Sequence, residues 1–543
     1  MAQKVSGRTC RPDVPGKSIP TSRWAAAVMF AAFAVGVHLY APAVDSPFVF
    51  DDFAVPLDEP PHNLLACVSG VRPLLMLSYW LNGAMWGNSP VGYHFCNLVI
   101  HAVNAGLVFL VLAKLLALSG VTNTHATRVA AVLGAAVFFI HPLQTESVAY
   151  ITGRSESLAS LFVLLAYVVF LYRRQESISW LETAVVITLF AFGVSTKENA
   201  VCLVGMLVLT DVYWPRTSSM QGLRNNWKLY AALALGAALA AWKVFRVLAA
   251  STSAGFSIPE ATWYQYGFTQ ARAFFTYLQL AAIPAGQSID HAYPVSHNIL
   301  EHGAIIYLAA LAALIAVCFV WRKRYPLACF GFFLTLIILA PTSSIVPISD
   351  PVAERRMYLP LLGLILIGFE IAGHVRVRRF TGYTILGVIL AGFYALCYHR
   401  NLLWAEPSQL FLDAAAESTN GRPYLNMVKV LAEEHRCNVA IPYLQQAEQR
   451  LPDNYNVELA WGRAWECMGQ PRKALDKLLR VALLWPSSDV YTMIGCLYGE
   501  MGRPVQAGLA LRKAVALDSR SETARRALAD WNQWMHDNRY LNR

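Results

Sequence analysis

Long apolar blocks constrain this chain more than any other feature of its sequence. Each block runs for about 17 to 25 residues, the length that crosses the hydrocarbon core of a bilayer as an α-helix. The composition agrees, because 56% of the 543 residues are hydrophobic and only 14% are charged. We therefore predict an all-α, polytopic membrane bundle of about 11 transmembrane helices, which start near Trp24, His94, Arg128, Glu156, Trp180, Asn199, Leu229, Gly303, Leu327, Met357 and Thr381.

Basic residues orient these helices. By the positive-inside rule, clusters of basic residues mark the cytoplasmic side. One cluster precedes the first block, namely Lys4, Arg8, Arg11, Lys17 and Arg23. The others follow later blocks at Arg173/Arg174, Arg216/Arg224/Lys228, Arg322/Lys323/Arg324 and Arg376/Arg378/Arg379. Residues 266–283 would break the alternation as a full span, so we read them as re-entrant or interfacial. The first block could instead be a signal peptide, because Ala41-Pro42-Ala43 resembles a cleavage site, but its length favours a span.

From about Glu406 the composition changes to that of ordinary soluble helices. Gly462 and Gly495, like Ala474 and Ala507, recur at a spacing near 33, the period of a tetratricopeptide array. We predict at least three helix pairs over residues 423–520 and a closing helix over residues 521–536. The chain then divides into a transmembrane domain, residues 1–405, and a repeat domain, residues 406–543. Such an array holds an extended partner in its concave groove or serves as a structural lid.

The 10 cysteines form no CxxC pair. Cys67, Cys437, Cys467 and Cys496 would face an oxidising compartment if the non-cytoplasmic side is periplasm or lumen, so a disulfide could form there. Sequence cannot pair them, and we favour unpaired core cysteines. The net charge of +10 comes mostly from the cytoplasmic clusters and a basic repeat region, without a basic-aromatic stripe or a phosphate-binding glycine loop. We therefore expect no nucleic-acid partner.

Polar residues concentrate in five stretches on the predicted non-cytoplasmic surface: FVFDDFAV (48–55), VRPLLMLSYWLNGAMWGNSPVGYHFCNLVIHAVN (71–104), HPLQTESVAYITGRSES (141–157), STKEN (195–199) and SDPVAERRMYLP (349–360). Charges at the mouth of a helical bundle are costly unless they are paired, hydrated or used on a substrate. This ring is therefore a candidate functional site. The alternative is local pairing or helix capping, which would join Arg154 to Glu156, Lys197 to Glu198 and Glu354 to Arg355.

Known catalytic and metal motifs do not occur in these stretches. Asn97, His101 and Asn104 form one helical stripe, which favours hydrogen bonds between helices. His94 and His101 are seven residues apart and could share a helix face, but two such ligands do not make a zinc site. Neither a G-x-S-x-G turn nor an H-E-x-x-H helix is present. We expect no cofactor and no metal, since the carboxylates lack an evident coordinating set.

The order of the stretches resembles that of a known family. FDDFAV, RPLLMLSYWLNGAMWGNSPVGYHFCNLVIHAVN, HPLQTESVAYITGRSESLASLF, KENA followed by Asp211, and PTSSIVPISDPVAERRMYLPLLG precede the repeats. Together they resemble the transmembrane and tetratricopeptide-repeat O-mannosyltransferases and their bacterial relatives, over nearly the whole chain. The repeat array is shorter than in the animal members, which is typical of a bacterial-type relative.

The resemblance implies the GT-C glycosyltransferase architecture. It implies an inverting transfer of mannose or a similar sugar from a polyprenyl-phosphate donor to Ser/Thr hydroxyls of proteins. The groove geometry of repeat arrays separately predicts that the repeats hold or admit the acceptor polypeptide. Asp51 aligns with the leading Asp of the family's acidic pair, and Asp52 aligns with its neighbour. The expected location is the bacterial inner membrane with periplasmic repeats, or the ER membrane with lumenal repeats.

The residues suit this chemistry. Asp51 or Asp52 would take the proton from the acceptor hydroxyl; we favour Asp51, and mutual repulsion should raise the pKa of one of the two. The candidates to hold the donor phosphate are Arg72, Arg154, Lys197 and Arg355. Further candidates for donor phosphate or sugar binding are His94, His141, Glu146, Glu156, Glu198, Glu354, Arg356 and Tyr358. Two alternatives stay open: a non-catalytic membrane scaffold, and a transferase acting on glycan or lipid acceptors.

Overall fold

The computed structural model describes residues 21–54, 70–87, 89–173, 177–214, 221–248, 254–256, 261–376, 378–418, 420–519 and 521–539. The basic residues up to Lys17, together with Cys67, Arg174 and Arg216, lie outside these ranges. Within them the chain is built from helices and loops, with one isolated β-bridge between Ala254 and Ile348. The predicted all-α fold is confirmed.

The membrane region contains the following helices: α1 (Thr21–Leu39), α2 (Ala41–Val44), α4 (Pro73–Trp86), α5 (Pro90–Leu118), α6 (Thr124–Ile140), α7 (Thr145–Val148), α8 (Arg154–Arg173), α9 (Trp180–Thr196), α10 (Cys202–Tyr213), α11 (Gln221–Asn225), α12 (Trp227–Leu248), α13 (Trp263–Ala282), α14 (Ala304–Trp321), α15 (Pro326–Leu339), α16 (Leu361–His374) and α17 (Arg379–Ala405). Short 3-10 turns connect several of them: η1 (Phe50–Ala54), η2 (Pro142–Gln144), η3 (Glu198–Val201), η4 (Glu301–Gly303) and η5 (Glu354–Met357).

Helices occupy all the predicted apolar blocks. Five described helices, α1, α5, α8, α14 and α17, are long and apolar enough to cross a membrane. Helix α6, with the segment 142–148 bent from it by 55°, gives a sixth. The shorter apolar helices α9, α15 and α16, the apolar part of α12, and the 12-residue α10 account for the other blocks. Helix α13, which covers most of the predicted re-entrant segment 266–283, is not among the candidate spans. The chain is a multi-pass membrane protein, and the number of spans stays a prediction.

Helix α5 forms the centre of the bundle, and α1, α6 and α8 pack against it. Gly106 permits the approach of α1, because a Cβ there would lie 2.3 Å from Met29 Cγ. Gly331 of α15 and Gly363 of α16 act in the same way: a Cβ on either would lie 2.3 Å from the other's carbonyl oxygen. Membrane helices depend on such close contacts, since lipid supplies little hydrophobic drive for their association.

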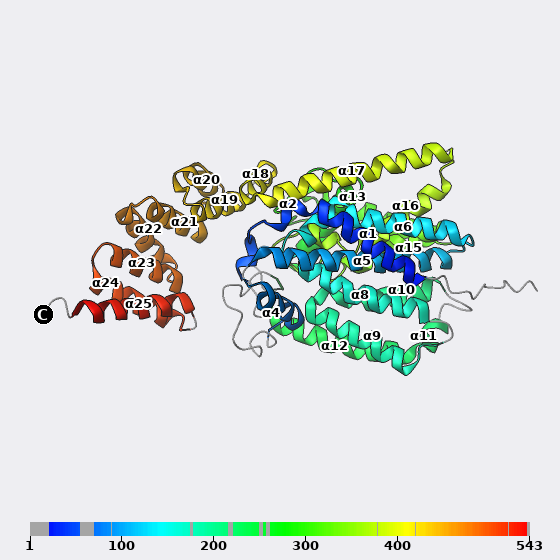
Figure 1. The fold of residues 1–543 in the computed structure, drawn as a ribbon, viewed down its shortest axis with the longest axis horizontal. Coiled ribbons are helices and arrows are strands. Elements are labelled where there is room, and N and C mark those ends of the chain that lie inside the picture. The colour runs from blue at the N-terminus through cyan, green and yellow to red at the C-terminus, as the bar shows by residue number, and fades with distance from the viewer. Residues whose placement is uncertain are drawn as a thin grey trace, which may run out of the picture.

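The two ends of the bundle differ. In Figure 1 the membrane helices run along the long axis of the molecule, and the repeats extend it beyond one end. The short helix α4 lies at this repeat end, whereas α11, which carries Arg224, lies at the opposite end. Helix α17 follows one edge of the bundle and leads into α18 (Pro407–Glu417) after a single residue, Glu406.

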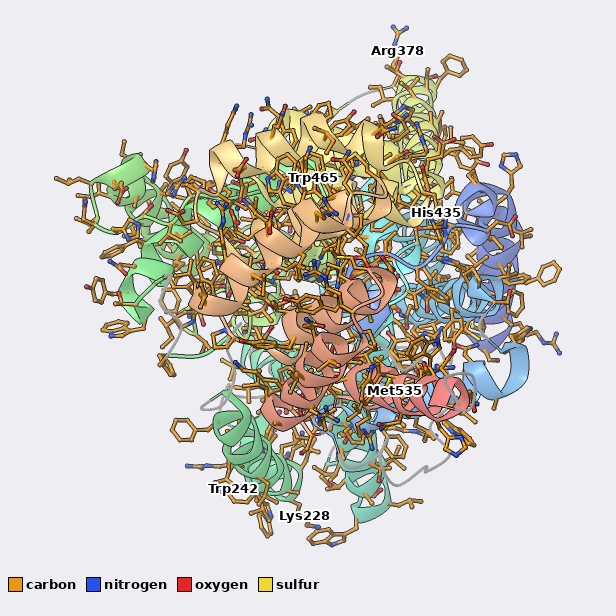
Figure 2. The ribbon with its side chains drawn as sticks, turned by 90° about the vertical axis from the view of Figure 1, so that its left-hand side faces the viewer. Lys228, Trp242, Arg378, His435, Trp465 and Met535 are labelled. Atoms are coloured by element: carbon orange, nitrogen blue, oxygen red, sulfur yellow. A yellow bond between two sulfur atoms is a disulfide. The ribbon has the colours of Figure 1, made fainter. Side chains whose placement is uncertain are left out.

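The repeats form three helix pairs: α19 (Arg422–Glu433) with α20 (Cys437–Arg450), α21 (Tyr455–Cys467) with α22 (Pro471–Leu484), and α23 (Ser488–Glu500) with α24 (Pro504–Leu517). Helix α25 (Glu522–Arg539) closes the array, as predicted. The periodic glycines leave space for a leucine of the paired helix. A Cβ on Gly462 would lie 2.6 Å from the Leu478 side chain, and a Cβ on Gly495 would lie 2.6 Å from the Leu511 side chain. Viewed from the repeat side in Figure 2, the helices carrying Trp465 and Met535 lie in front of the bundle.

A disulfide joins the first two repeats. It connects Cys437, at the start of α20, to Cys467, at the end of α21, with 6.1 Å between their Cα atoms. Our preference for unpaired cysteines was wrong for these two, while Cys496 is free. Helix pairing brings the two residues together although 30 positions separate them in sequence, a proximity that sequence spacing alone does not indicate.

Loss of this disulfide should destabilise the repeats. Replacing Cys437 and Cys467 by Ser should lower the free energy of unfolding of this region by about 2–4 kcal/mol, because the unfolded chain regains the freedom of the closed loop. Denaturant unfolding followed by tryptophan fluorescence measures the effect, with Cys496→Ser as the control. Free thiols at both positions in the non-reduced protein would contradict the assignment.

Candidate active site

The acidic loop lies at the repeat end of the bundle. Phe50, the first residue of η1, has φ 52°, a left-handed conformation that is strained for a bulky residue. Its ring packs edge-on against Phe411 of α18, with 4.9 Å between ring centroids, and also contacts Tyr150. These aromatic contacts hold the turned backbone, which leaves Asp51 exposed and Asp52 buried.

Asp52 anchors the loop. It is 1% exposed, its Oδ2 accepts a hydrogen bond from the Val49 N–H at 3.1 Å, and its Oδ1 accepts from the Thr152 N–H at 2.9 Å. Burial raises the pKa of Asp52 to about 7, although these two N–H groups oppose the rise; the nearby charge of Asp51 adds to it. Repulsion between the two carboxylates is therefore a smaller cause than burial.

Asp51 faces a cleft. Its exposed side chain lines a cavity of about 290 Å³, and Arg355 of the bundle and Lys429 of the repeats line the same cavity. Its backbone N–H donates to the Tyr150 hydroxyl at 3.0 Å, but within the described ranges no group donates to its carboxylate. An accessible carboxylate with free oxygens is able to take a proton from a bound hydroxyl.

Glu146 positions Arg355. The Arg355 guanidinium donates from Nη1 to Glu146 Oε1, and its backbone N–H donates to Glu146 Oε2 at 2.7 Å. Burial alone would lower the pKa of Arg355, but the charge of Glu146 outweighs burial, and the pKa is raised. Glu146 is almost fully buried, whereas the Arg355 side chain remains 24% exposed. The guanidinium is therefore charged, held in place and accessible from the cleft.

Glu354 faces away from Arg355, towards the loop that follows α13. Its carboxylate accepts hydrogen bonds from Gln287 Nε2 at 2.6 Å and from the Ser288 N–H at 2.7 Å, and it contacts His291 Nε2 at 3.1 Å. Burial works against ionisation, yet the His291 contact lowers the pKa of Glu354 and raises that of His291. Glu354 thus fixes this loop, and the local pair with Arg355 does not form.

Two further ion pairs lie near these residues. Arg72 holds Glu198 through two hydrogen bonds, of 3.0 Å from Nε and 2.5 Å from Nη2. Lys197 Nζ donates to Glu156 Oε1 at 2.7 Å. Burial lowers the pKa of Lys197; the charge of Glu156 opposes this, and the positive charges of Arg72 and Arg355 add to the lowering. The three cations therefore share one electrostatic environment.

The local-pairing alternative is wrong for these charges. Glu156 pairs with Lys197 and accepts from Asn199 Nδ2 at 2.7 Å, so it does not pair with Arg154. Glu198 pairs with Arg72, so it does not pair with Lys197. Each ion pair connects two separate stretches, and together with Arg355–Glu146 they link stretches 71–104, 195–199, 141–157 and 349–360 in series.

Arg154 is buried away from the cleft. It is 1% exposed, and it donates from Nε to Asn97 Oδ1 at 2.6 Å and from Nη2 to the Tyr93 carbonyl at 2.9 Å. Its guanidinium also lies over the Tyr79 ring, 4.8 Å from the centroid. Among the four cations predicted to hold phosphate, Arg154 is thus the one that packs α4, α5 and α8 together.

The remaining candidates also contact the protein itself. His94 Nε2 lies 3.2 Å from Ser46 Oγ, His141 Nε2 lies 3.0 Å from the Ala281 carbonyl, the Tyr358 hydroxyl lies 2.8 Å from His101 Nδ1, and Arg356 donates to the carbonyls of Asp350 and Pro351. None of the four lines the cavity that Asp51 faces. Within the described ranges, no group of three or more His, Cys, Asp or Glu side chains could hold a metal.

The repeats contribute residues that sequence reasoning missed. Arg422, at the start of α19, donates to both oxygens of Asp290, at 2.5 and 2.6 Å, and forms a salt bridge with Asp350 at 2.7 Å. Asp350 lies within the polar stretch 349–360, but Asp290 belongs to the loop after α13 and Arg422 to the first repeat helix, α19. Only the folded chain reveals that these residues meet beside Asp51.

Asp52 should give the protein a pH-dependent stability. Its pKa of about 7 exceeds the value near 3.9 of an unfolded Asp, so the folded state favours the protonated form. The protonated carboxyl therefore adds to the free energy of unfolding. This stabilisation is complete below about pH 4 and is lost as the pH rises through 7, which lowers the free energy of unfolding by an amount on the order of 4 kcal/mol. Thermal unfolding of the detergent-purified protein from pH 4 to 8 measures the slope, which Asp52→Asn should flatten. A slope unchanged by Asp52→Asn but abolished by Asp51→Asn would contradict this assignment.

The comparisons with known proteins point to one group of relatives. No family model matches the chain. It is similar to the protein named "Protein O-mannosyl-transferase TMTC3" of Mus musculus, with 24% identity over 460 residues, covering 76% of this chain and 48% of the relative. The chain is a homologue of the TMTC O-mannosyltransferases. "Protein O-mannosyl-transferase TMTC4" of Homo sapiens is also 24% identical, over 75% of this chain and 64% of the relative.

These relatives confirm the resemblance of the chain to the transmembrane and tetratricopeptide-repeat O-mannosyltransferases. The chain spans about half the length of the first curated relatives it matches. A chain from the crystal structure of the APC/C hetero-tetramer Cut9-Hcn1 aligns with 14% identity over 86% of this chain and 91% of its own, with a TM-score of 0.24. A score that low carries no argument about this chain.

Proposed function

We propose that this TMTC homologue is a membrane glycosyltransferase that moves a sugar from a polyprenyl-phosphate donor to Ser/Thr hydroxyls of polypeptides. One observation carries the proposal: the free carboxylate of Asp51 and the guanidinium of Arg355 line the same cavity at the repeat end. A base and a phosphate-binding cation are the two groups that such a transfer requires. The names of the relatives support a transfer of mannose.

In the proposed reaction Asp51 removes the proton from the acceptor hydroxyl. The hydroxyl oxygen attacks the anomeric carbon, the bond from that carbon to the phosphate oxygen breaks, and polyprenyl phosphate leaves with the electron pair. Arg355 stabilises the charge that develops on the leaving phosphate. A single displacement of this kind inverts the anomeric configuration. Asp52 acts as a positioning residue, because both of its oxygens bind backbone N–H groups.

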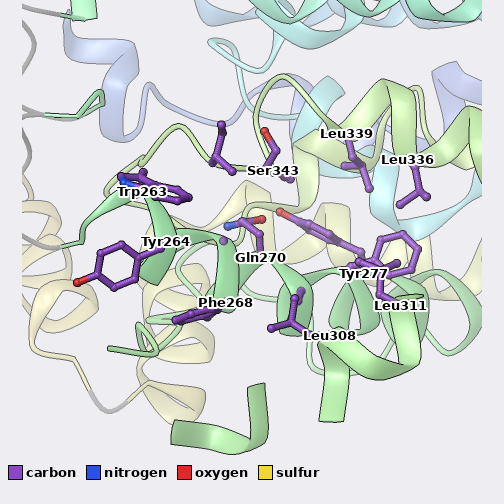
Figure 3. A pocket seen from close by; sticks show the side chains of 15 residues that line it. Trp263, Tyr264, Phe268, Gln270, Tyr277, Leu308, Leu311, Leu336, Leu339 and Ser343 are labelled. Atoms are coloured by element: carbon purple, nitrogen blue, oxygen red, sulfur yellow. The ribbon is translucent and has the colours of Figure 1, made fainter. Parts of the chain in front are cut away.

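An apolar groove offers a place for the polyprenyl chain. It has a volume of about 390 Å³ and lies between α13, α14 and α15, with Leu308, Leu311, Leu336 and Leu339 among its lining residues (Figure 3). Gln270, also at the groove, donates from Nε2 to the Pro351 carbonyl at 2.8 Å. Pro351 is four residues before Arg355, so one loop borders both the apolar groove and the charged cavity. A lipid-linked sugar needs this combination.

The Cys437–Cys467 disulfide supports an oxidising compartment for the repeats, namely the periplasm or the ER lumen. The basic residues at the opposite end support the same orientation, because positive loops face the cytoplasm. We therefore place the reaction on the non-cytoplasmic side. Thiol-reactive probes that do not cross membranes, applied to cysteines introduced at each end of the bundle in intact cells or vesicles, would test this orientation.

The activity is tested with purified enzyme, a radiolabelled polyprenyl-phosphate mannose and an unstructured Ser/Thr peptide. Label should enter the peptide and be released by alkaline β-elimination, as expected for an O-linked sugar. Label that enters only glycan or lipid acceptors would overturn the protein acceptor. If no polyprenyl-phosphate sugar is used at all, the membrane scaffold becomes the better description.

A further inference from the structure

Two side-chain amides of the repeats face the same cavity as Asp51. Asn426 of α19 and Asn456 of α21 both line it. Asn426 is only 9% exposed, and within the described part of the chain neither amide has a hydrogen-bond partner. Asn456 is exposed, and neither amide is among the buried side-chain atoms without a partner, so both amides are accessible from the cavity. Their donors and acceptors are therefore available to a ligand.

The cavity continues along the seam between the bundle and the repeats. A second cavity, of about 390 Å³, shares Ile289, Asp350, Arg355 and Arg422 with the first. We name the two together the seam trough: the loops 289–294 and 349–355 form one wall, and the start of the repeats forms the other. Its lining is mostly polar, so an apolar chain does not suit it. Arg422 spans it and compensates the charges of Asp290 and Asp350.

We propose that the seam trough binds the acceptor as an extended polypeptide segment whose main chain is held by Asn426 and Asn456. A carboxamide offers one acceptor oxygen and two N–H donors, which match the C=O and N–H groups of an unpaired peptide backbone. An extended segment places such groups every 3.3 to 3.6 Å or so along its length. The catalytic meaning of the trough rests on the function proposed above, because its end at Asp51 would receive the Ser or Thr hydroxyl.

This mode of binding has a consequence for specificity. Amides that bind the main chain do not distinguish one flanking side chain from another, so the acceptor is selected for being extended rather than for a sequence. It also assigns the first two repeats to the substrate site, because Asn426 lies on α19 and Asn456 on α21. Folded protein surfaces, whose backbone groups are already paired, should be poor acceptors.

Peptide binding without donor tests the trough. A fluorescent, unstructured Ser-containing peptide is titrated with the detergent-purified full chain, and anisotropy gives the dissociation constant. Asn426→Ala and Asn456→Ala should each weaken binding about threefold to tenfold, and the double variant about tenfold to a hundredfold. Asn438→Ala, an exposed Asn on α20 outside the trough, is the matched control and should bind as the unaltered chain does.

The double variant should unfold at the same temperature as the unaltered chain, because the two amides make no internal hydrogen bond in the described structure. N-methylation of the peptide backbone next to the Ser should weaken binding, and scrambling the flanking residues should not. Unchanged binding by the double variant, or a scrambled peptide that loses as much affinity as the N-methylated one, would overturn the proposal. Binding with these properties but no sugar transfer would leave the trough intact and refute the catalytic function.

Discussion

Replacing Asp51 by Asn should lower sugar transfer about a hundredfold to ten-thousandfold, because Asn keeps the size of the side chain but cannot accept the proton. The fold should be unaffected, since the Asp51 side chain is exposed and its anchoring contact is made by the backbone N–H. Donor binding should also persist, because the cations of the site are held by other carboxylates. Initial rates with saturating donor and peptide measure the effect.

Asp52→Asn is the matched control for Asp51. An Asn amide at position 52 would bring N–H donors against the N–H of Val49 or Thr152, so we expect some distortion of the loop but no loss of the base. Transfer should therefore fall less than in Asp51→Asn. If Asp51→Asn keeps near-normal turnover while Asp52→Asn abolishes it, the roles of the two residues are reversed; normal turnover in both would remove the carboxylate base from the mechanism.

Replacing Arg355 by Ala should reduce donor use about tenfold to a hundredfold, the loss of one charge-assisted contact of about 1.5 to 3 kcal/mol. Lys should rescue it only in part, because a single ammonium cannot reproduce the planar fork of a guanidinium. The Ala variant also leaves Glu146 buried and unpaired, which destabilises proteins by about 3 to 5 kcal/mol. The apparent KM for the donor and the melting temperature are measured together.

The paired variant Arg355→Ala/Glu146→Gln separates these two effects. It removes both charges, so most of the melting temperature should return while donor use remains low. Recovery of donor use in the paired variant would show that Arg355 serves only as the partner of Glu146. Lys114→Ala changes a half-buried cation of α5 outside the cavity of Asp51, and it checks that loss of one positive charge does not by itself impair donor binding.

The sequence predicted the helices well and the ion pairs poorly, for a physical reason. Helix length and apolar content are local properties, so each block could be recognised without knowing its neighbours. The partner of a charge is a property of the tertiary fold: Glu156 is two residues from Arg154 but binds Lys197 from another loop. Residues adjacent in sequence at a helix start point in different directions, and loops that converge provide the partners.

The same reason explains which site residues escaped prediction. Asp51 stood out because two carboxylates follow an apolar block, and Arg355 because it lies in a charged turn. Asn426 and Asn456 occur among ordinary repeat residues and have no distinguishing sequence context. Their position beside Asp51 depends on how the repeats dock, through the ring of Phe50 on Phe411 and the Arg422 salt bridges. Arg154 shows the converse, since its charge suggested a ligand but its burial assigns it to packing.

In the described part of the chain, the repeats dock on the bundle through their first helices, by the ring of Phe50 on Phe411 and the Arg422 salt bridges. In stacked helical arrays each unit contacts only its neighbours, so a further helix pair inserted between α24 and the closing helix α25 would meet only those two. Neither Asn426 nor Asn456 would move. An array of this design can therefore lengthen or shorten by whole units during evolution and acquire new surfaces for other proteins, while the chemistry beside the membrane stays the same.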